Sequence, residues 1–345
     1  GGIDSSAIVA LMASISEQPV HTFSVVFQEK KFDESAFSSL IAQKFNTSHH
    51  PILLHPEDFL HELNPALKAM DHPSGDGINS YVVSQATKKE GFTVALSGLG
   101  GDELFAGYDV FTRYRKIKQA SSLYQLPMGL RKLGSQMAGT LIARHKVARL
   151  QEIMTLEAPS FEDTYPIFRK LYSPDEIKSL TGAYRDQNQL SRIYSPSQLR
   201  QIDDLPIYSQ VSLGEISTYT QNVLLRDTDQ MSMAHSLEVR VPFFDHELVE
   251  YTLGIPDEIK HPQYPKRLLV ESLGDLLPDE VVHRKKMGFT FPWPIWMRGE
   301  LKEMCEKSLN RLAERGIVDG DTVRSYWDMF VKEDLQMIWM KLWVL

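Results

Sequence analysis

The chain has 345 residues, of which 42% are hydrophobic and 24% charged, and its formal net charge is -8. This composition is typical of a soluble globular protein with one large or two ordinary domains, and the acidic balance argues against a nucleic-acid-binding face. No apolar run approaches about 18 residues, which argues against a membrane-spanning helix.

The chain opens with GGIDSS, a glycine turn that leads into a predicted helix. Ile8, Leu11, Met12 and Ile15 recur at the spacing of one apolar helix face. A glycine turn before a helix can direct backbone N–H groups at an anion. The turn lacks the lysine of the G-x-x-x-x-G-K-[ST] loop, and its N–H groups, hydroxyls and carboxylate suit a pyrophosphate held with Mg²⁺. A plain glycine-rich helix entry is the alternative.

Strand and helix patterns then alternate along the first part of the chain. The predicted strands cover residues 20–27, 49–54 and 93–97, and the predicted helices cover residues 33–45, 58–70 and 80–90. This order predicts an α/β fold, a parallel sheet with helices on both faces. Ligands of such sheets bind beyond the carboxyl ends of the strands.

SGLGGDELFAGY, at residues 97–108, follows the last of these strands. Its glycines allow the backbone to approach a ligand closely, and Asp102 and Glu103 supply carboxylates. We expect this segment and GGIDSS to lie at the same edge of the sheet, so that Asp4 and Asp102 meet in one site. Taken alone, the segment also fits a glycine loop followed by an N-cap aspartate.

Helical periodicity dominates after about residue 114. The clearest segments are residues 141–153, 161–172, 211–233, 248–251, 268–277 and 327–345. We therefore predict an α/β nucleotide-binding core at residues 1–113 and a mainly helical part at residues 114–345. The single cysteine, Cys305, lies in a helix-like stretch and is expected to be structural, in a reducing, cytoplasmic setting.

Four segments together resemble the synthetase domain of the glutamine-hydrolysing asparagine synthetase family, which are ATP-dependent amidotransferases. GGIDSS resembles the SGGxDSS pyrophosphate loop of that family, and SGLGGDELFAGY resembles its second nucleotide motif. LLRDTDQMSMAHSLEVRVPFFDHELVEY (224–251) and HRKKMGFTFP (283–292) resemble its third and fourth signatures. The segments keep the family's order over nearly the whole chain.

The resemblance implies an adenine nucleotide alpha hydrolase-like fold with a PP-loop and an AMP-forming ligase activity. ATP would convert a carboxylate to an acyl-adenylate, and ammonia would then displace AMP. The residues implied for pyrophosphate and ATP are Gly1, Gly2, Asp4, Ser5, Ser6, Val25, Ser97 and Gly98. The residues implied for Mg²⁺ are Asp4 and Asp102, and those implied for catalysis are Lys286, Asp102 and Glu103.

The basic residues of the later segments carry different expectations. Lys286 occupies the family's catalytic lysine position, where one well-placed group contributes roughly 3 kcal/mol to transition-state stabilisation. Lys266, in YPKRLL, is a weaker candidate for the same cationic role and is expected to be exposed. Four residues of the third signature are expected either in buried ion pairs or in contact with the substrate: Arg226, Glu238, Arg240 and Asp245.

The identity of the acceptor stays open. Many asparagine-forming members carry an acidic residue where this chain has Leu99, and DHPSGDGINSY (71–81) lies where substrate-facing residues are expected. Aspartate is the default acceptor, and a sugar acid or another metabolite is the alternative. A non-catalytic nucleotide-binding scaffold is a second alternative, although Asp4, Asp102 and Lys286 are all retained.

The resemblance also implies partners. The family's parent protein carries an N-terminal glutaminase domain, whose first residue is a cysteine that releases ammonia, and this chain has no such cysteine. We expect the chain to be a piece of a longer polypeptide, to lack the first strand of its domain and to be impaired alone. The other expected partners are the small-molecule carboxylate, ammonia and a second copy in a homodimer.

Overall fold

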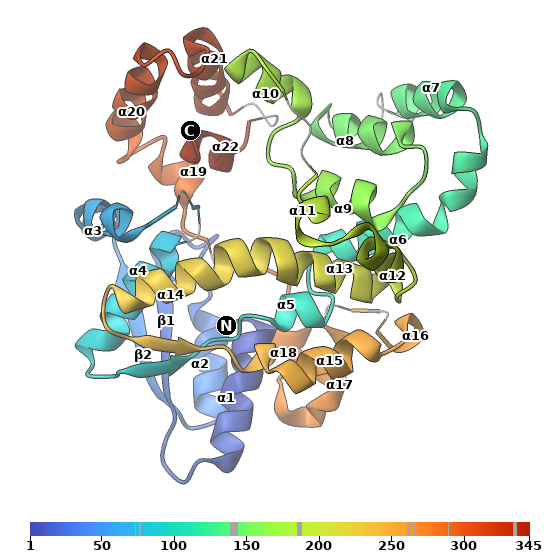
Figure 1. The fold of residues 1–345 in the computed structure, drawn as a ribbon. Coiled ribbons are helices and arrows are strands. Elements are labelled where there is room, and N and C mark those ends of the chain that lie inside the picture. Colours follow the sequence, from blue (N-terminus) through green and yellow to red (C-terminus); the bar gives the residue numbers. More distant parts are fainter. Residues whose placement is uncertain are drawn as a thin grey trace. The chain divides into compact units, whose positions relative to one another are not determined.

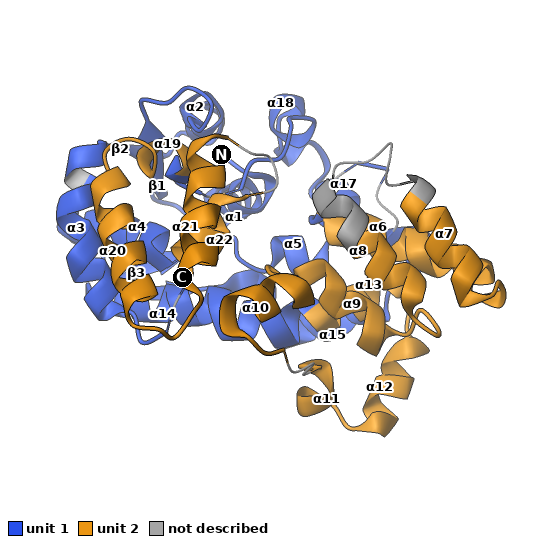
Figure 2. Ribbon diagram, turned by 90° about the horizontal axis from the view of Figure 1, so that it is seen from above, with its two compact units in different colours: residues 1–108, 215–293 blue, residues 109–214, 294–345 orange. Residues whose placement is uncertain are grey.

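The computed structural model describes residues 1–72, 74–75, 77–138, 144–184, 188–260, 263–264, 266–288, 290–333 and 337–345. Two compact units are present: unit 1 contains residues 1–108 and 215–293, and unit 2 contains residues 109–214 and 294–345 (Figure 2). The domain boundary expected after residue 113 stays a prediction. Pro73 and Asp76 of the expected substrate-facing segment, Phe289 of the fourth signature and residues 141–143 lie outside the described residues.

Unit 1 contains two small parallel sheets (Figure 1). Strand β1 (His21–Phe27) pairs with β2 (Ser48–Leu54), and β3 (Val94–Leu96) pairs with β4 (Glu238–Arg240). The parallel pairing confirms the α/β character expected from the sequence. Each sheet has two strands among the described residues, so a wider sheet with helices on both faces stays a prediction. Strand β4 went unpredicted because three residues are too few for a period-two pattern.

The helices of unit 1 come from both of its chain segments. The first segment forms α1 (Ile3–Ile15), α2 (Ser35–Lys44), α3 (Pro56–Ala69), α4 (Gly77–Lys89) and α5 (Gly101–Leu104). The second forms the π-helix η2 (Ile216–Leu224), α14 (Leu225–Met233), η3 (Pro242–Phe244), α15 (His246–Gly254), α16 (Asp257–Lys260), α17 (Arg267–Ser272), η4 (Gly274–Leu276) and α18 (Asp279–Val282).

The described residues of unit 2 form helices. Its first segment contains α6 (Asp109–Gln119), η1 (Ser121–Gln125), α7 (Met128–Ala138), α8 (Arg144–Thr155), α9 (Phe161–Arg169), α10 (Pro174–Thr181), α11 (Leu190–Ile193), α12 (Pro196–Asp203) and α13 (Ile207–Glu215). The second contains α19 (Trp293–Trp296), α20 (Lys302–Glu314), α21 (Gly320–Val331) and α22 (Trp339–Trp343). Cys305 is buried in α20, as expected of a structural cysteine. Within the described chain, every helix is too short or too polar to span a lipid bilayer.

A hydrophobic cluster in unit 1 holds together the helices that begin at the candidate site. Helix α1 contributes Ala7, Ile8 and Ala10. The other buried members, from α5, η3, α17 and the segments after them, are Leu104, Phe105, Phe243, Leu269, Val270, Leu273, Leu277 and Val282. Each large aliphatic side chain buried in this way contributes about 1.5–3 kcal/mol. The cluster therefore fixes the N-terminal ends of α1, α5 and α17 relative to one another.

The apolar face predicted for α1 is wrong in part. Ile8 is buried, but Leu11 is 43% exposed and Ile15 is 84% exposed. The face that packs on the cluster consists of Ala7, Ile8 and Ala10, with Met12 packed against it, so two of the four predicted residues are confirmed. Periodicity arguments favour large side chains, whereas a closely packed helix buries small ones, because these let neighbouring backbones approach.

Candidate functional site

The first loop of the site is the N-terminal end of α1. Gly2 is the N-cap residue, without a side-chain hydrogen bond to the helix. The backbone ladder begins where the Ser6 N–H donates to the Gly2 carbonyl at 3.0 Å, and the Ser5 hydroxyl donates to the same oxygen at 3.2 Å. Gly1 lies against Glu34, whose Cβ would be 3.2 Å from an added Cβ. The N–H groups before Ser6 have no acceptor within the helix and are available to an anion.

The second loop follows β3. The Ser97 N–H donates to the Arg240 carbonyl of β4 at 2.9 Å, and the Leu99 N–H donates to the Ser97 hydroxyl at 3.3 Å. Gly100, at φ +101°, is in the left-handed region that favours glycine and is the N-cap of α5. This turn places Asp102 in the first turn of α5.

The two loops approach each other so closely that glycine is needed between them. A Cβ on Gly98 would lie 2.7 Å from the Ser5 nitrogen and 2.9 Å from the Asp4 Cβ. A Cβ on Gly101 would overlap the Asp4 carboxylate. The pyrophosphate loop and the second nucleotide motif therefore form one site, as the sequence predicts.

Asp4 and Asp102 share one ammonium group. Nζ of Lys266 pairs with Oδ2 of Asp4 and lies 2.8 Å from Oδ1 of Asp102. Lys286 approaches the same Asp102 oxygen at 2.5 Å, donates to the Gly107 carbonyl at 3.1 Å and lies 4.2 Å from the centroid of the Tyr108 ring. Two acidic and two basic side chains from distant parts of the chain thus meet in unit 1.

The expectation that Lys266 is exposed is wrong, since its side chain is only 5% exposed. Lys266 precedes α17 at φ +58°, and Gly107 leaves room for its stem, because a Cβ on Gly107 would overlap Lys266 and Asp102. Two carboxylates that are mostly removed from water need a nearby positive charge. No motif marks this lysine as buried, so its burial depends on the tertiary structure.

The charges of the cluster shift one another's pKa values. Burial raises the pKa of Asp4 to about 6, against the opposing effect of Lys266. Burial also acts to raise the pKa of Asp102, but Lys266 and Lys286 outweigh it and the pKa is lowered. For Lys286, burial lowers the pKa more than Asp102 raises it. Asp102 is therefore the more strongly ionised carboxylate of the pair.

Glu103 and Val25 lie in different surroundings from the charged cluster. Glu103 is buried and accepts hydrogen bonds from the Tyr108 hydroxyl at 2.9 Å and the Thr220 hydroxyl of η2 at 3.3 Å. Burial, and then the negative charge of Asp102, raises the pKa of Glu103. Val25 is buried in β1, where it pairs with Ile52. The adenosine-binding role of Val25 stays a prediction.

Among the described residues, Arg226, Glu238, Arg240 and Asp245 form no buried ion pair. Arg226 pairs with Asp71 at 2.6 Å, but both side chains are nearly half exposed. Glu238 and Arg240 pair with each other at 2.7 Å on the surface, and Asp245 caps α15. All four residues are exposed. A charged residue in the sequence does not by itself indicate whether its ion pair is buried or exposed.

The carboxylates of Asp4 and Asp102 fit Mg²⁺, which proteins usually hold with one or two carboxylates plus phosphate oxygens. Asp4 Oδ1 is buried and has no hydrogen-bond partner among the described residues. The glycine at position 101 leaves the space beside this oxygen that a Cβ would fill. Within the described chain, no group of three or more His, Cys, Asp or Glu side chains is arranged for a metal.

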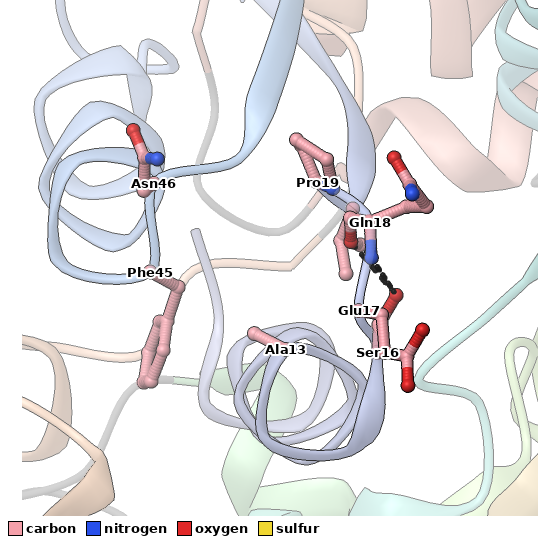
Figure 3. A pocket seen from close by; sticks show the side chains of 8 residues that line it. Ala13, Ser16, Glu17, Gln18, Pro19, Phe45 and Asn46 are labelled. Atoms are coloured by element: carbon pink, nitrogen blue, oxygen red, sulfur yellow. Dashed lines mark hydrogen bonds between the residues drawn. The ribbon is translucent and has the colours of Figure 1, made fainter.

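A separate pocket lies at the other end of α1, lined by Ala13, Ser16, Glu17, Gln18, Pro19, Val20, Phe45 and Asn46 (Figure 3). Its volume is about 210 Å³. Since a helix rises about 1.5 Å per residue, the pocket is separated from Asp4 by most of the length of α1. It also adjoins the amino end of β1, whereas ligands of parallel sheets bind at the carboxyl ends.

The family model described as asparagine synthase matches residues 1–344. The chain belongs to the asparagine synthase family. It is 30% identical, over 94% of its length and 50% of the relative's, to asparagine synthetase (glutamine-hydrolysing) 1 of Bacillus subtilis. It is 28% identical to asparagine synthetase (glutamine-hydrolysing) 3 of the same organism, over 83% of this chain and 43% of the relative.

A more distant relative carries a different name. The amidase chyE of Penicillium rubens is 23% identical over 97% of this chain and 55% of its own length. The relatives that this chain matches therefore carry names for different amide chemistry. The chain spans about half the length of the curated relatives it matches.

Proposed function

We propose that this chain is the ATP-using synthetase part of a glutamine-dependent amidotransferase that makes asparagine from aspartate. The observation that carries the proposal is the meeting of Asp4 and Asp102 at one ammonium group, between two glycine loops. A plain helix entry or an isolated N-cap would not need the two carboxylates together. The asparagine synthetases among the relatives support the same activity.

In this proposal the two loops hold the polyphosphate of ATP. The free N–H groups at the start of α1 and the hydroxyls of Ser5 and Ser6 bind the pyrophosphate part, while Ser97 and Gly98 lie beside the adenosine part. Asp4 and Asp102 would hold Mg²⁺, which when bound offsets the negative charge of the phosphates. The aspartate carboxylate attacks the α-phosphorus, so that pyrophosphate leaves and an acyl-adenylate forms.

Lys286 acts on the charge that develops during these steps. Its side chain is 37% exposed, and its ammonium is held by Asp102, Gly107 and the face of Tyr108, so the group is oriented on a side chain that solvent still reaches. We assign it the stabilisation of negative charge at the α-phosphate and, after ammonia attacks the carbonyl, at the tetrahedral oxygen. Glu103 keeps Tyr108 in place through its hydrogen bond.

Ammonia would come from a glutaminase domain outside this chain. The relatives named as glutamine-hydrolysing are about twice as long as the matched region, which leaves room for such a domain in those proteins. Ammonium chloride can replace the ammonia that this domain would supply, so the synthetase step can be assayed without glutamine.

The test is aspartate-dependent release of pyrophosphate from Mg·ATP in the presence of ammonium chloride. Asp4→Asn and Asp102→Asn should each lower the rate by at least roughly 100-fold, as expected when a well-placed charged group is lost from a reaction centre. Asp109→Asn is the matched control, because Asp109 is 87% exposed and pairs only on the surface with Arg113 of its own helix. Wild-type rates in Asp4→Asn would refute the proposal.

One observation favours a carboxylate substrate other than aspartate. Leu99, in the second loop, is aliphatic where many asparagine-forming members carry an acidic residue, and its backbone N–H is already used by Ser97. The aliphatic side chain of Leu99 cannot accept a hydrogen bond from the ammonium group of an aspartate substrate. Pyrophosphate release should therefore be measured across a panel of carboxylic acids that includes sugar acids, and turnover with one of these but not with aspartate would replace the first proposal.

A further inference from the structure

Lys266 is more deeply buried than the two carboxylates that it contacts. Its side chain is 5% exposed, against 17% for Asp4 and 19% for Asp102. The ammonium therefore lies between the two acidic groups and is largely shielded from water.

Two local features place the Lys266 ammonium: a backbone conformation that is unusual for lysine, and a glycine beside the lysine side chain. Lys266 has φ +58°, a conformation that residues other than glycine seldom adopt. Gly107 leaves open the path of the Lys266 stem, which a Cβ there would block. A lysine on the surface needs neither the positive φ nor the neighbouring glycine. Both features therefore agree with a functional requirement for the ammonium at this position.

Lys266 holds one oxygen of each carboxylate that would bind the metal ion, while Oδ1 of Asp4 has no hydrogen-bond partner among the described residues. Its Nζ contacts Oδ2 of Asp4 and Oδ1 of Asp102, one oxygen from each loop. Lys286, by contrast, contacts only Asp102 of the pair and has the Gly107 carbonyl and the Tyr108 ring as further partners. Lys266 is thus the cation that bridges the two loops.

We propose that Lys266 is a built-in counter-cation: it holds Asp4 and Asp102 together before Mg·ATP binds and opposes the binding of a free divalent cation to the same two carboxylates. The inference rests on the proposed function. When Mg·ATP binds, phosphate oxygens can accept hydrogen bonds from the same ammonium. Lys266 is a positioning residue in this account.

One consequence is discrimination between the free metal ion and the metal nucleotide. A free divalent cation on these carboxylates is repelled by the buried Lys266 ammonium beside it. The metal nucleotide brings phosphate oxygens whose negative charge offsets this repulsion and which accept hydrogen bonds from the ammonium. Lys266 should therefore weaken binding of the free ion and strengthen binding of the nucleotide complex.

Titration of the chain with Mn²⁺, read by electron paramagnetic resonance, tests this without turnover. Lys266→Met should bind free Mn²⁺ at least tenfold more tightly than the wild type and Mn·ATP at least tenfold more weakly. Lys266→Gly, which relieves the positive φ, should show the same two opposite changes if Lys266→Met unfolds. Arg267→Met is the control, because Arg267 pairs with Glu271 outside the cluster and its loss changes the net charge equally.

Opposite changes in the two affinities for either Lys266 variant, with Arg267→Met unchanged, support the proposal. Equal affinity of wild type and Lys266 variants for free Mn²⁺, including no binding by any of them, overturns it. A merely structural lysine would lower both affinities together, which also overturns it. Failure of the proposed function is separate, because it appears as a wild-type chain that releases no pyrophosphate with any carboxylate.

Discussion

Substitution of Lys286 should lower kcat more than it weakens the binding of Mg·ATP. Lys286→Ala removes a cation from the reaction centre, so we expect kcat to fall by roughly 100-fold, about 3 kcal/mol. The dissociation constant of Mg·ATP should change less, because the loops around Asp4 and Ser97 remain. Stopped-flow pyrophosphate release and equilibrium ATP binding measure the two effects.

Lys285→Ala is the control for that experiment, because Lys285 is exposed beside the same position. It should leave both quantities near their wild-type values. A Lys286→Ala variant that loses ATP binding and turnover in equal proportion would contradict the catalytic role.

Single residues show what the sequence could and could not predict at this site. The glycines and carboxylates of the two loops were predictable, because Gly98, Gly101 and Asp102 lie close together in the sequence and form a motif. The burial of Lys266 was not, because it depends on space left by Gly107 and on two acidic groups distant in sequence. A lysine in a polar segment is usually exposed, and only tertiary contacts reverse that expectation.

At the scale of elements, α1 and the loop after β3 approach so closely at Gly98 that a side chain there should push them apart. Gly98→Ala places a Cβ 2.7 Å from the Ser5 nitrogen, so the loops must separate. Overpacking of this kind costs about 1–3 kcal/mol, and we expect that loss in the free energy of unfolding measured with urea. Loss of pyrophosphate release should accompany it.

Gly134→Ala, within α7, is the matched control. A Cβ at Gly134 meets nothing within 4 Å, and alanine favours the helix by about 0.5–1 kcal/mol. This variant should be as stable as the wild type or more so. An equally stable Gly98→Ala variant would show that the two loops do not touch.

Element positions were predicted better than element faces. The strands expected at residues 20–27, 49–54 and 93–97 correspond to β1, β2 and β3. The buried face of α1 was predicted only in part, because alanines share it with Ile8 and Met12, whereas Leu11 and Ile15 are exposed. Local sequence thus predicted where elements lie, while packing decided which side of each is buried.

At the scale of the whole molecule, the charged cluster is a product of chain topology. Unit 1 contains residues 1–108 and 215–293, and Asp4, Asp102, Lys266 and Lys286 all belong to it. The hydrophobic cluster beneath α1, α5 and α17 brings these segments together. The sequence indicated that Asp4 and Asp102 share a site through the known position of ligands in parallel sheets, not through any local contact.

The central claim is that Asp4 and Asp102 hold one metal nucleotide jointly, and a double-mutant cycle on the dissociation constant of Mn·ATP tests it most directly. Asp4→Asn and Asp102→Asn should each weaken binding, and the double variant should be little weaker than either one, with a coupling energy of at least about 1 kcal/mol. Losses that add, or single variants that bind as tightly as the wild type, would contradict the claim.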